Sequence, residues 1–114
     1  AHTASAHALY EGFTACDKTR HIAHGLLVGF GNLCLLALEQ RSDDELLAAI
    51  ALARASTIPT HLDEFAPTLN EAELQQIIEH SLNAADMANM PFDVSYQQMR
   101  DAIARVQQLS GQKS

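Results

Sequence analysis

The sequence contains few of the residues that β-strands favour. Aromatic side chains make up 5% of its 114 residues, there is no tryptophan, and β-branched residues are scarce. Ala, Leu, Glu and Gln dominate instead, and these residues favour helices. No stretch alternates between apolar and polar residues as a half-buried strand would. The sequence therefore predicts an all-α fold.

Positive charge and long apolar runs are also scarce. Seven Lys and Arg residues stand against 14 Asp and Glu residues, for a formal net charge of −7. Nucleic acids and anionic membrane surfaces both require clustered basic side chains. Apolar runs such as Leu33 to Leu38 are far shorter than the roughly 18–20 residues of a membrane span. We therefore expect neither a nucleic-acid partner nor a membrane partner.

The chain has only two cysteines, Cys16 and Cys34. They do not form a CxxC pair, and two cysteines in a helical chain do not suggest a disulfide scaffold. We expect a reducing, cytoplasmic setting in which both act as small buried hydrophobic residues.

The length allows one domain with one hydrophobic core, so residues 1–114 are expected to form a single all-α domain. The chain begins AHTASAH, with no initiator Met and no signal pattern. We therefore expect a piece of a longer protein, either an isolated domain or a proteolytic remnant.

The apolar periodicity predicts a helical bundle of about six helices. Their expected ranges are 4–16, a second helix from Thr19 or His21 to 40, then 43–56, a short turn at 61–66, 71–83 and 96–109. Ser5, Ser42, Thr60, Asn70 and Ser95 are the expected N-caps of five of them, because their side chains can accept a backbone N–H.

Two groups of glycines lie inside predicted helices. Gly12 interrupts the first helix, which predicts a close approach by a backbone or a ligand at that point. Gly25 and Gly29 are four residues apart in the second helix, a spacing that predicts tight packing against another helix.

Three of the six histidines lie between His7 and Gly31. On a helix, His21 and His24 would share one face within about 6 Å at Cβ. His7 lies on the preceding helix, which a short polar break can fold back beside the second. Imidazole is a common ligand for Zn²⁺ and Fe²⁺, and a catalytic metal takes about three protein ligands.

The residue types and spacing alone leave two interpretations of these histidines open. One is a metal site, and the other is a set of structural or surface histidines. The remaining helical histidines, His61 and His80, lie at polar positions and are expected at the surface.

The segment SAHALYEGFT, followed by HIAHGLLVGFG, resembles the metal-binding core of the iron-containing alcohol dehydrogenase superfamily. The glycerol dehydrogenase branch is the nearest match. The later segments TIPTHLDEFA and NMPFDVSYQQMRDAI resemble that branch in the same order, so the similarity covers most of the chain. The expected fold resembles the C-terminal part of the dehydroquinate synthase-like and iron-containing alcohol dehydrogenase fold.

This resemblance implies a two-domain, NAD(P)-dependent enzyme. An N-terminal α/β domain, absent from this chain, would bind the nucleotide, and an all-α domain would supply the metal ligands. His7 and His24 match two ligands of a divalent metal, Zn²⁺ or Fe²⁺. His21 matches a histidine that lines the cleft and is a possible proton relay. The third ligand is an aspartate upstream of the matched segment, so it is not in this chain.

The implied reaction is metal-assisted hydride transfer on a small alcohol, a polyol such as glycerol, or a 2-hydroxy or 2-oxo acid. The full enzyme would be a homo-oligomer, and this chain alone would be inactive. Two departures leave the substrate open. Tyr10 stands where the branch often has a second histidine, and Leu26 and Leu27 stand where it usually has a polar or charged pair.

Two other functions remain open on the residues alone. The chain could be a stand-alone helical binding or scaffold domain with structural histidines, or a small autonomous metalloprotein. A segment of a larger enzyme should also expose an apolar patch, expected near Leu26, Leu27 and Phe30 and masked by self-association.

Overall fold

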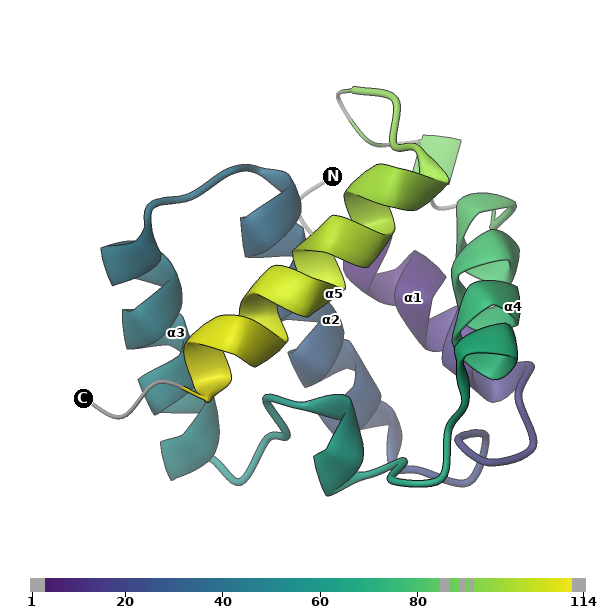
Figure 1. Ribbon diagram of the computed structural model, residues 1–114, viewed down its shortest axis with the longest axis horizontal. Helices are drawn as coiled ribbons and strands as arrows, with labels where there is room; N and C mark the ends of the chain where they lie inside the picture. The colour runs from purple at the N-terminus through teal and green to yellow at the C-terminus, as the bar shows by residue number, and fades with distance from the viewer. Residues whose placement is uncertain (1–3, 85–86, 89, 91, 112–114) are drawn as a thin grey trace.

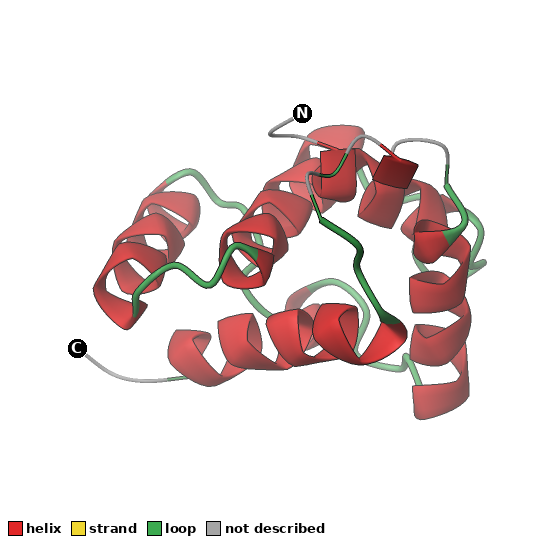
Figure 2. Ribbon diagram, turned by 90° about the horizontal axis from the view of Figure 1, so that it is seen from above, coloured by secondary structure: helices red, strands yellow, loops and turns green. Residues whose placement is uncertain are grey.

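The computed structural model of the chain describes residues 4–84, 87–88, 90 and 92–111. Within these residues it has five α-helices, one short 3₁₀ helix and no strand (Figure 2). The α-helices are α1 (Ala4–Thr14), α2 (His24–Leu38), α3 (Asp43–Ala55), α4 (Glu71–Leu82) and α5 (Tyr96–Ser110), and the 3₁₀ helix is η1 (Leu62–Glu64). The all-α prediction is confirmed. The count of about six helices is slightly too high, because the segment 61–66 forms only a 3₁₀ turn.

Helix α2 occupies the centre of the bundle and contacts α1, α3 and α5. Helix α5 lies across α2, with α3 on one side and α4 on the other (Figure 1). Helix α4 packs against α1. The core formed between these helices includes Leu9, Phe13, Leu27, Phe30, Leu46, Ile50, Ile77, Ile78, Met99, Ile103 and Val106. None of the described helices is long and apolar enough to cross a membrane.

Three phenylalanines form an aromatic cluster in this core. Phe13 and Phe30 have ring centroids 6.2 Å apart, and each lies 5.5 Å from the ring of Phe65. All three pairs are T-shaped, which is a preferred arrangement of aromatic rings. The cluster joins α1 and α2 to the turn that follows η1.

The expected exposed patch near Leu26, Leu27 and Phe30 is therefore wrong. Leu27 and Phe30 are fully buried, and Leu26 is half-buried. The reason is that the chain supplies its own covering for this face of α2, from α1 and the turn at Phe65. Among the described residues, the exposed large hydrophobic side chains are Leu52 and Phe92.

Three of the five predicted N-caps are confirmed. The other two are wrong, because Ser5 lies inside α1 and His61, not Thr60, caps η1. In the confirmed caps, each side chain accepts a hydrogen bond from the backbone N–H three residues later: Ser42 from Glu45, Asn70 from Glu73 and Ser95 from Gln98. In α4 and α5 the third helical residue also accepts the N–H of the cap, which completes a capping box.

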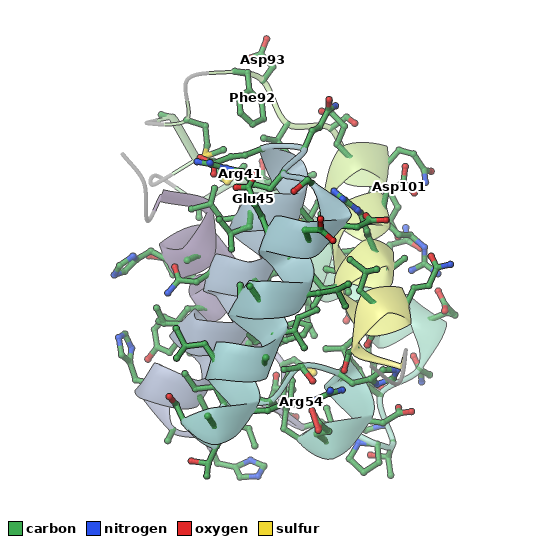
Figure 3. The ribbon with its side chains drawn as sticks, turned by 90° about the vertical axis from the view of Figure 1, so that its left-hand side faces the viewer. Arg41, Glu45, Arg54, Phe92, Asp93 and Asp101 are labelled. Carbon is green, nitrogen blue, oxygen red and sulfur yellow. The ribbon has the colours of Figure 1, made fainter. Side chains whose placement is uncertain are left out.

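A partly buried polar link ties the end of α3 to the end of α5. The Arg54 guanidinium donates to the Ser110 hydroxyl at 2.9 Å and also to the Ser110 carbonyl oxygen. The Ser110 hydroxyl shares a further hydrogen bond of 2.6 Å with the buried hydroxyl of Thr60. Arg54 lies at one end of α3, and the ion pair of Arg41 and Glu45 lies at the other (Figure 3).

Gly12 is the point where α1 approaches α4. A Cβ at Gly12 would collide with the carbonyl oxygen of Ile77 and the hydroxyl of Ser81. The predicted close approach is therefore confirmed, and it is made by the backbone of α4.

The tight contact of α2 with another helix lies at Gly31, two residues beyond Gly29. A Cβ at Gly31 would lie 3.0 Å from both the Cα and the carbonyl oxygen of Ala6 in α1. Gly29 faces the side chain of Ile58, which is not in a helix, and Gly25 has nothing within 4 Å. The prediction of helix packing through Gly25 and Gly29 is therefore wrong, because helix spacing alone does not tell which small residue meets a neighbour.

Candidate functional site

The segment between α1 and α2 folds as a series of turns. The backbone N–H groups of Thr19 and Arg20 both donate to the carbonyl oxygen of Cys16, at 3.1 and 2.9 Å. The side chain of Thr19 is fully buried, and its hydroxyl donates to the carbonyl oxygen of Phe13 near the end of α1. These bonds satisfy carbonyl groups that the helix end leaves unpaired. They also hold this segment out of a helix.

Helix α2 therefore begins at His24, and its predicted start at Thr19 or His21 is wrong. His21 lies in the turns and is exposed. The expectation that His21 and His24 share one helical face is wrong for the same reason. His24 is the first residue of α2, and its side chain is exposed.

His7 and His24 come together from adjacent helices. His7 is half-buried on α1, and its ring centroid lies 6.4 Å from that of His24, with an interplanar angle of 60°. The expected folding of the first helix back beside the second is thus confirmed. The close approach of Gly31 to Ala6 sets the separation of α1 and α2, and Ala6 directly precedes His7.

The spacing of the two rings can be compared with that of a shared metal ion. Two imidazole nitrogens at about 2.1 Å from a tetrahedral cation bring their ring centroids to about 5 Å. The rings of His7 and His24 would therefore have to close by about 1 Å from their present separation. His24 is exposed at the first position of α2, so a small movement of its side chain can cover this distance. The separation of the rings is compatible with two ligands of one divalent cation.

No third ligand accompanies this pair in the part of the chain that the structure describes. Across residues 4–84, 87–88, 90 and 92–111, no group of three His, Cys, Asp or Glu side chains is placed to hold a metal ion. A three-ligand site built on His7 and His24 would take its remaining ligand from outside these residues.

Tyr10 completes the surroundings of His24. Its ring centroid lies 4.3 Å from that of His24, with an interplanar angle of 72°. Tyr10 follows His7 by three residues on α1, so both rings lie on the same face of that helix. The sequence marks Tyr10 only as a departure from the family pattern. Its spacing from His7 predicts only that the two share a face of α1, and the packing of α1 on α2 brings Tyr10 beside His24.

The two remaining helical histidines lie away from this pair. His80 is exposed, as expected. His61 is half-buried, and its Nδ1 accepts a 3.0 Å hydrogen bond from the N–H of Asp63, so it caps η1. Its role in this structure is therefore a local one.

Both cysteines are free thiols. Cys34 is buried as predicted, and this burial raises the pKa of its thiol far above the ordinary value. Cys16 is only half-buried, so the expectation of two buried cysteines holds for Cys34 alone. Neither thiol has the geometry of a disulfide pair or of a metal cluster among the described residues.

Comparisons with known proteins agree on one family, although no protein-family model matches the chain. A glycerol dehydrogenase of Pseudomonas putida is 33% identical over 93% of this chain and 30% of its own length. Hydroxycarboxylate dehydrogenase A of Escherichia coli is 30% identical over 91% of this chain and 29% of its own length.

Solved structures show the same relationship in the fold. The crystal structure of a probable glycerol dehydrogenase from Sinorhizobium meliloti has a TM-score of 0.83 and 28% identity, over 93% of this chain and 31% of that one. Glycerol dehydrogenase from Schizosaccharomyces pombe also has a TM-score of 0.83, with 26% identity, over 93% of this chain and 28% of that one.

The expected resemblance is thereby confirmed in both sequence and fold, along nearly the whole of this chain. The chain spans about 30% of the length of the relatives it matches. It is therefore homologous to the glycerol dehydrogenases and the related hydroxycarboxylate dehydrogenases, and corresponds to a helical segment of these proteins.

Proposed function

We propose that this chain supplies two metal ligands, His7 and His24, to a metal-dependent, NAD(P)-linked dehydrogenase. The observation that carries the proposal is the meeting of these two rings across α1 and α2, in a fold that matches glycerol dehydrogenases with a TM-score of 0.83. Residues 1–114 would form one all-α unit, the distal part of the helical domain.

The substrate class follows from the names of the relatives. These are glycerol dehydrogenases, a glycolaldehyde reductase of Halobacterium salinarum and a hydroxycarboxylate dehydrogenase. All three names describe small, oxygen-rich molecules that carry a hydroxyl or carbonyl group. We propose that the substrate is a small alcohol, a polyol, or a 2-hydroxy or 2-oxo acid.

Each histidine has a defined part in this proposal. His7 and His24 present imidazole rings from two helices whose separation is set at Gly31. A bound Zn²⁺ or Fe²⁺ would act as a Lewis acid on the substrate hydroxyl, and NAD(P) would accept the hydride. His21 is exposed just before α2, so it can exchange protons with water and is proposed as the proton relay.

Two parts of the reaction would come from elsewhere. The described residues hold no group of three metal ligands, and the chain spans about 30% of its relatives' length. We propose that the third ligand and the nucleotide site lie outside this chain. The isolated chain should accordingly show no dehydrogenase activity with NAD⁺ or NADP⁺ and a small polyol.

A Zn²⁺ titration, followed by calorimetry and by the imidazole NMR signals, tests the proposed ligands. The chain should bind Zn²⁺ weakly, because two imidazoles make an incomplete site. His7→Ala and His24→Ala should each abolish this binding. His80→Ala is the matched control, since His80 is also helical and exposed, and it should change nothing.

Two results would contradict the proposal. Tight stoichiometric binding that survives both ligand substitutions would indicate an autonomous metal site elsewhere in the chain. The absence of binding by the unmodified chain would favour the helical binding or scaffold domain, with His7 and His24 as structural residues.

A further inference from the structure

We propose that Tyr10 is a positioning residue, whose aromatic ring holds the imidazole of His24 in the orientation that faces His7. This inference rests on the proposed function, in which His24 is a metal ligand. It assigns to Tyr10 a role that acts through His24 and not on the substrate.

His24 receives little support from its own helix. It is the first residue of α2, it is exposed, and the preceding Ala23 has no side chain that can cap the helix. The next residue, Gly25, has open space around it. The ring contacts of His24 come from α1 instead, and Tyr10 is the nearer partner at 4.3 Å, against 6.4 Å for His7.

The geometry of the contact restricts the imidazole. The rings of Tyr10 and His24 meet edge to face at 72°, an arrangement that aromatic pairs prefer. Such a contact fixes the tilt of both rings, so it limits rotation about the side-chain bonds of His24. A ligand on an exposed helix start is thereby kept to a narrower range of orientations, close to His7, before a metal binds.

Helix α1 gives Tyr10 a rigid base. On one side the backbone of α1 closes on α2 at Gly31, and on another it closes on α4 at Gly12. Tyr10 itself is half-buried against the core. Neighbours that orient a metal ligand typically change metal affinity by about 10–100-fold when they are removed. The same range is expected here.

The contact assigns this role to the ring and not to the hydroxyl. Among the described residues, no hydrogen bond joins the Tyr10 hydroxyl to His24, whereas the centroids of the two rings lie 4.3 Å apart. A phenylalanine should therefore replace Tyr10, and an aliphatic residue should not.

Zn²⁺ affinity of the 114-residue chain, measured from the His24 imidazole NMR signals, separates these variants. Tyr10→Phe should stay within about twofold of the unmodified chain, and Tyr10→Leu and Tyr10→Ala should each weaken binding by about tenfold or more. Tyr10→Leu keeps most of the apolar volume, so it serves if Tyr10→Ala fails to fold. Tyr96→Leu, at the other tyrosine, should leave the affinity unchanged.

A second readout needs no metal. In the metal-free chain, nuclear Overhauser effects should connect the ring protons of Tyr10 with those of His24, and they should persist in Tyr10→Phe. In Tyr10→Leu, the His24 signals should show averaging over several ring orientations.

The outcomes distinguish this inference from the proposed function. If His7→Ala and His24→Ala abolish binding while Tyr10→Leu binds like the unmodified chain, the positioning role is overturned and the ligand assignment stands. A loss in Tyr10→Phe equal to that in Tyr10→Leu would overturn the role of the ring and assign it to the hydroxyl. If neither histidine affects binding, the proposed function fails, and the ring contact is then judged by the Overhauser effects alone.

Discussion

Helix α2 begins differently from the three helices that follow it. Helices α3, α4 and α5 start with Ser42, Asn70 and Ser95, and each of these side chains accepts a backbone N–H. Helix α2 starts after Ala23, whose methyl group can accept nothing, and its first residue is the exposed His24. The candidate metal ligand thus stands at the helix start where local structure contributes least to stability.

A similar contrast separates the two parts of α2 itself. Its first turn borders open space, since a Cβ at Gly25 would meet no other atom within 4 Å. From Leu27 onward the helix enters the core, where Phe30 and Cys34 are almost fully buried. The difference indicates that the later part of α2 stabilises the bundle, while the first turn is free to serve the site.

Two glycine substitutions test the difference between the two parts of α2, and one of them should have the largest effect on stability. Gly31→Ala places a Cβ 3.0 Å from the backbone of Ala6, so we expect the free energy of unfolding to fall by about 1–3 kcal/mol through overpacking. Gly25→Ala meets open space and should raise it by about 0.4–1 kcal/mol. Urea unfolding followed by circular dichroism measures both. Equal effects from the two substitutions would show that the two parts of α2 do not differ as described.

Substitutions at the N-caps should have the next largest effect on the free energy of unfolding, and they compare the start of α2 with that of α5. Ser95→Ala removes the cap of α5 and should lower the free energy of unfolding by about 0.5–2 kcal/mol. Ala23→Ser should raise it by a similar amount, because Ala23 already has the non-helical backbone that an N-cap needs, with φ −56° and ψ 136°. The midpoints of thermal unfolding report both changes. A destabilised Ala23→Ser variant would mean that the start of α2 is constrained by something other than its missing cap.

The smallest expected effect concerns acid pH and the start of α4. A hydrogen bond from Lys18, and then one from the backbone of Asn70, hold the pKa of Glu73 below its ordinary value. The folded chain therefore keeps this carboxylate charged where the unfolded chain, with an ordinary pKa of about 4.3, takes up a proton. The stability from Glu73 is present above that value and is lost as the pH falls through the pKa of the folded state.

Thermal unfolding between about pH 5 and pH 2 tests whether acidification lowers stability in this way. The midpoint should fall on acidification, and it should fall less steeply in Glu73→Gln. Helix α5 supplies the control, because the neutral Gln98 takes the corresponding position in its capping box. Gln98→Ala should lower stability equally at every pH. If the unfolding midpoint of Glu73→Gln falls with pH as steeply as that of the unmodified chain, Glu73 does not contribute to the acid dependence.

The starts of α3, α4 and α5 could be predicted because their chemistry is local. Asn70 and Glu73, for example, exchange hydrogen bonds three residues apart, and any chain with that pattern can make them. The start of α2 could not be predicted in the same way. Thr19 belongs to the turns because its hydroxyl reaches the carbonyl oxygen of Phe13, and apolar spacing carries no information about that contact.

In the candidate site, too, some features could be predicted from the sequence and others depend on the packing of the helices. The resemblance to a known family named His7 and His24, but helical spacing paired His24 with His21, which the turns leave outside α2. Tyr10 could be placed beside His24 only once the packing of α1 on α2 was known.

By itself, the sequence determined the helical class and three of the helix caps, because propensity and capping act within one helical turn. Only the tertiary structure decided that Gly31 sets the distance between α1 and α2, that Phe30 is covered, and that His24 meets His7 and Tyr10. These contacts join residues from different elements, and their geometry depends on how all the helices pack at once.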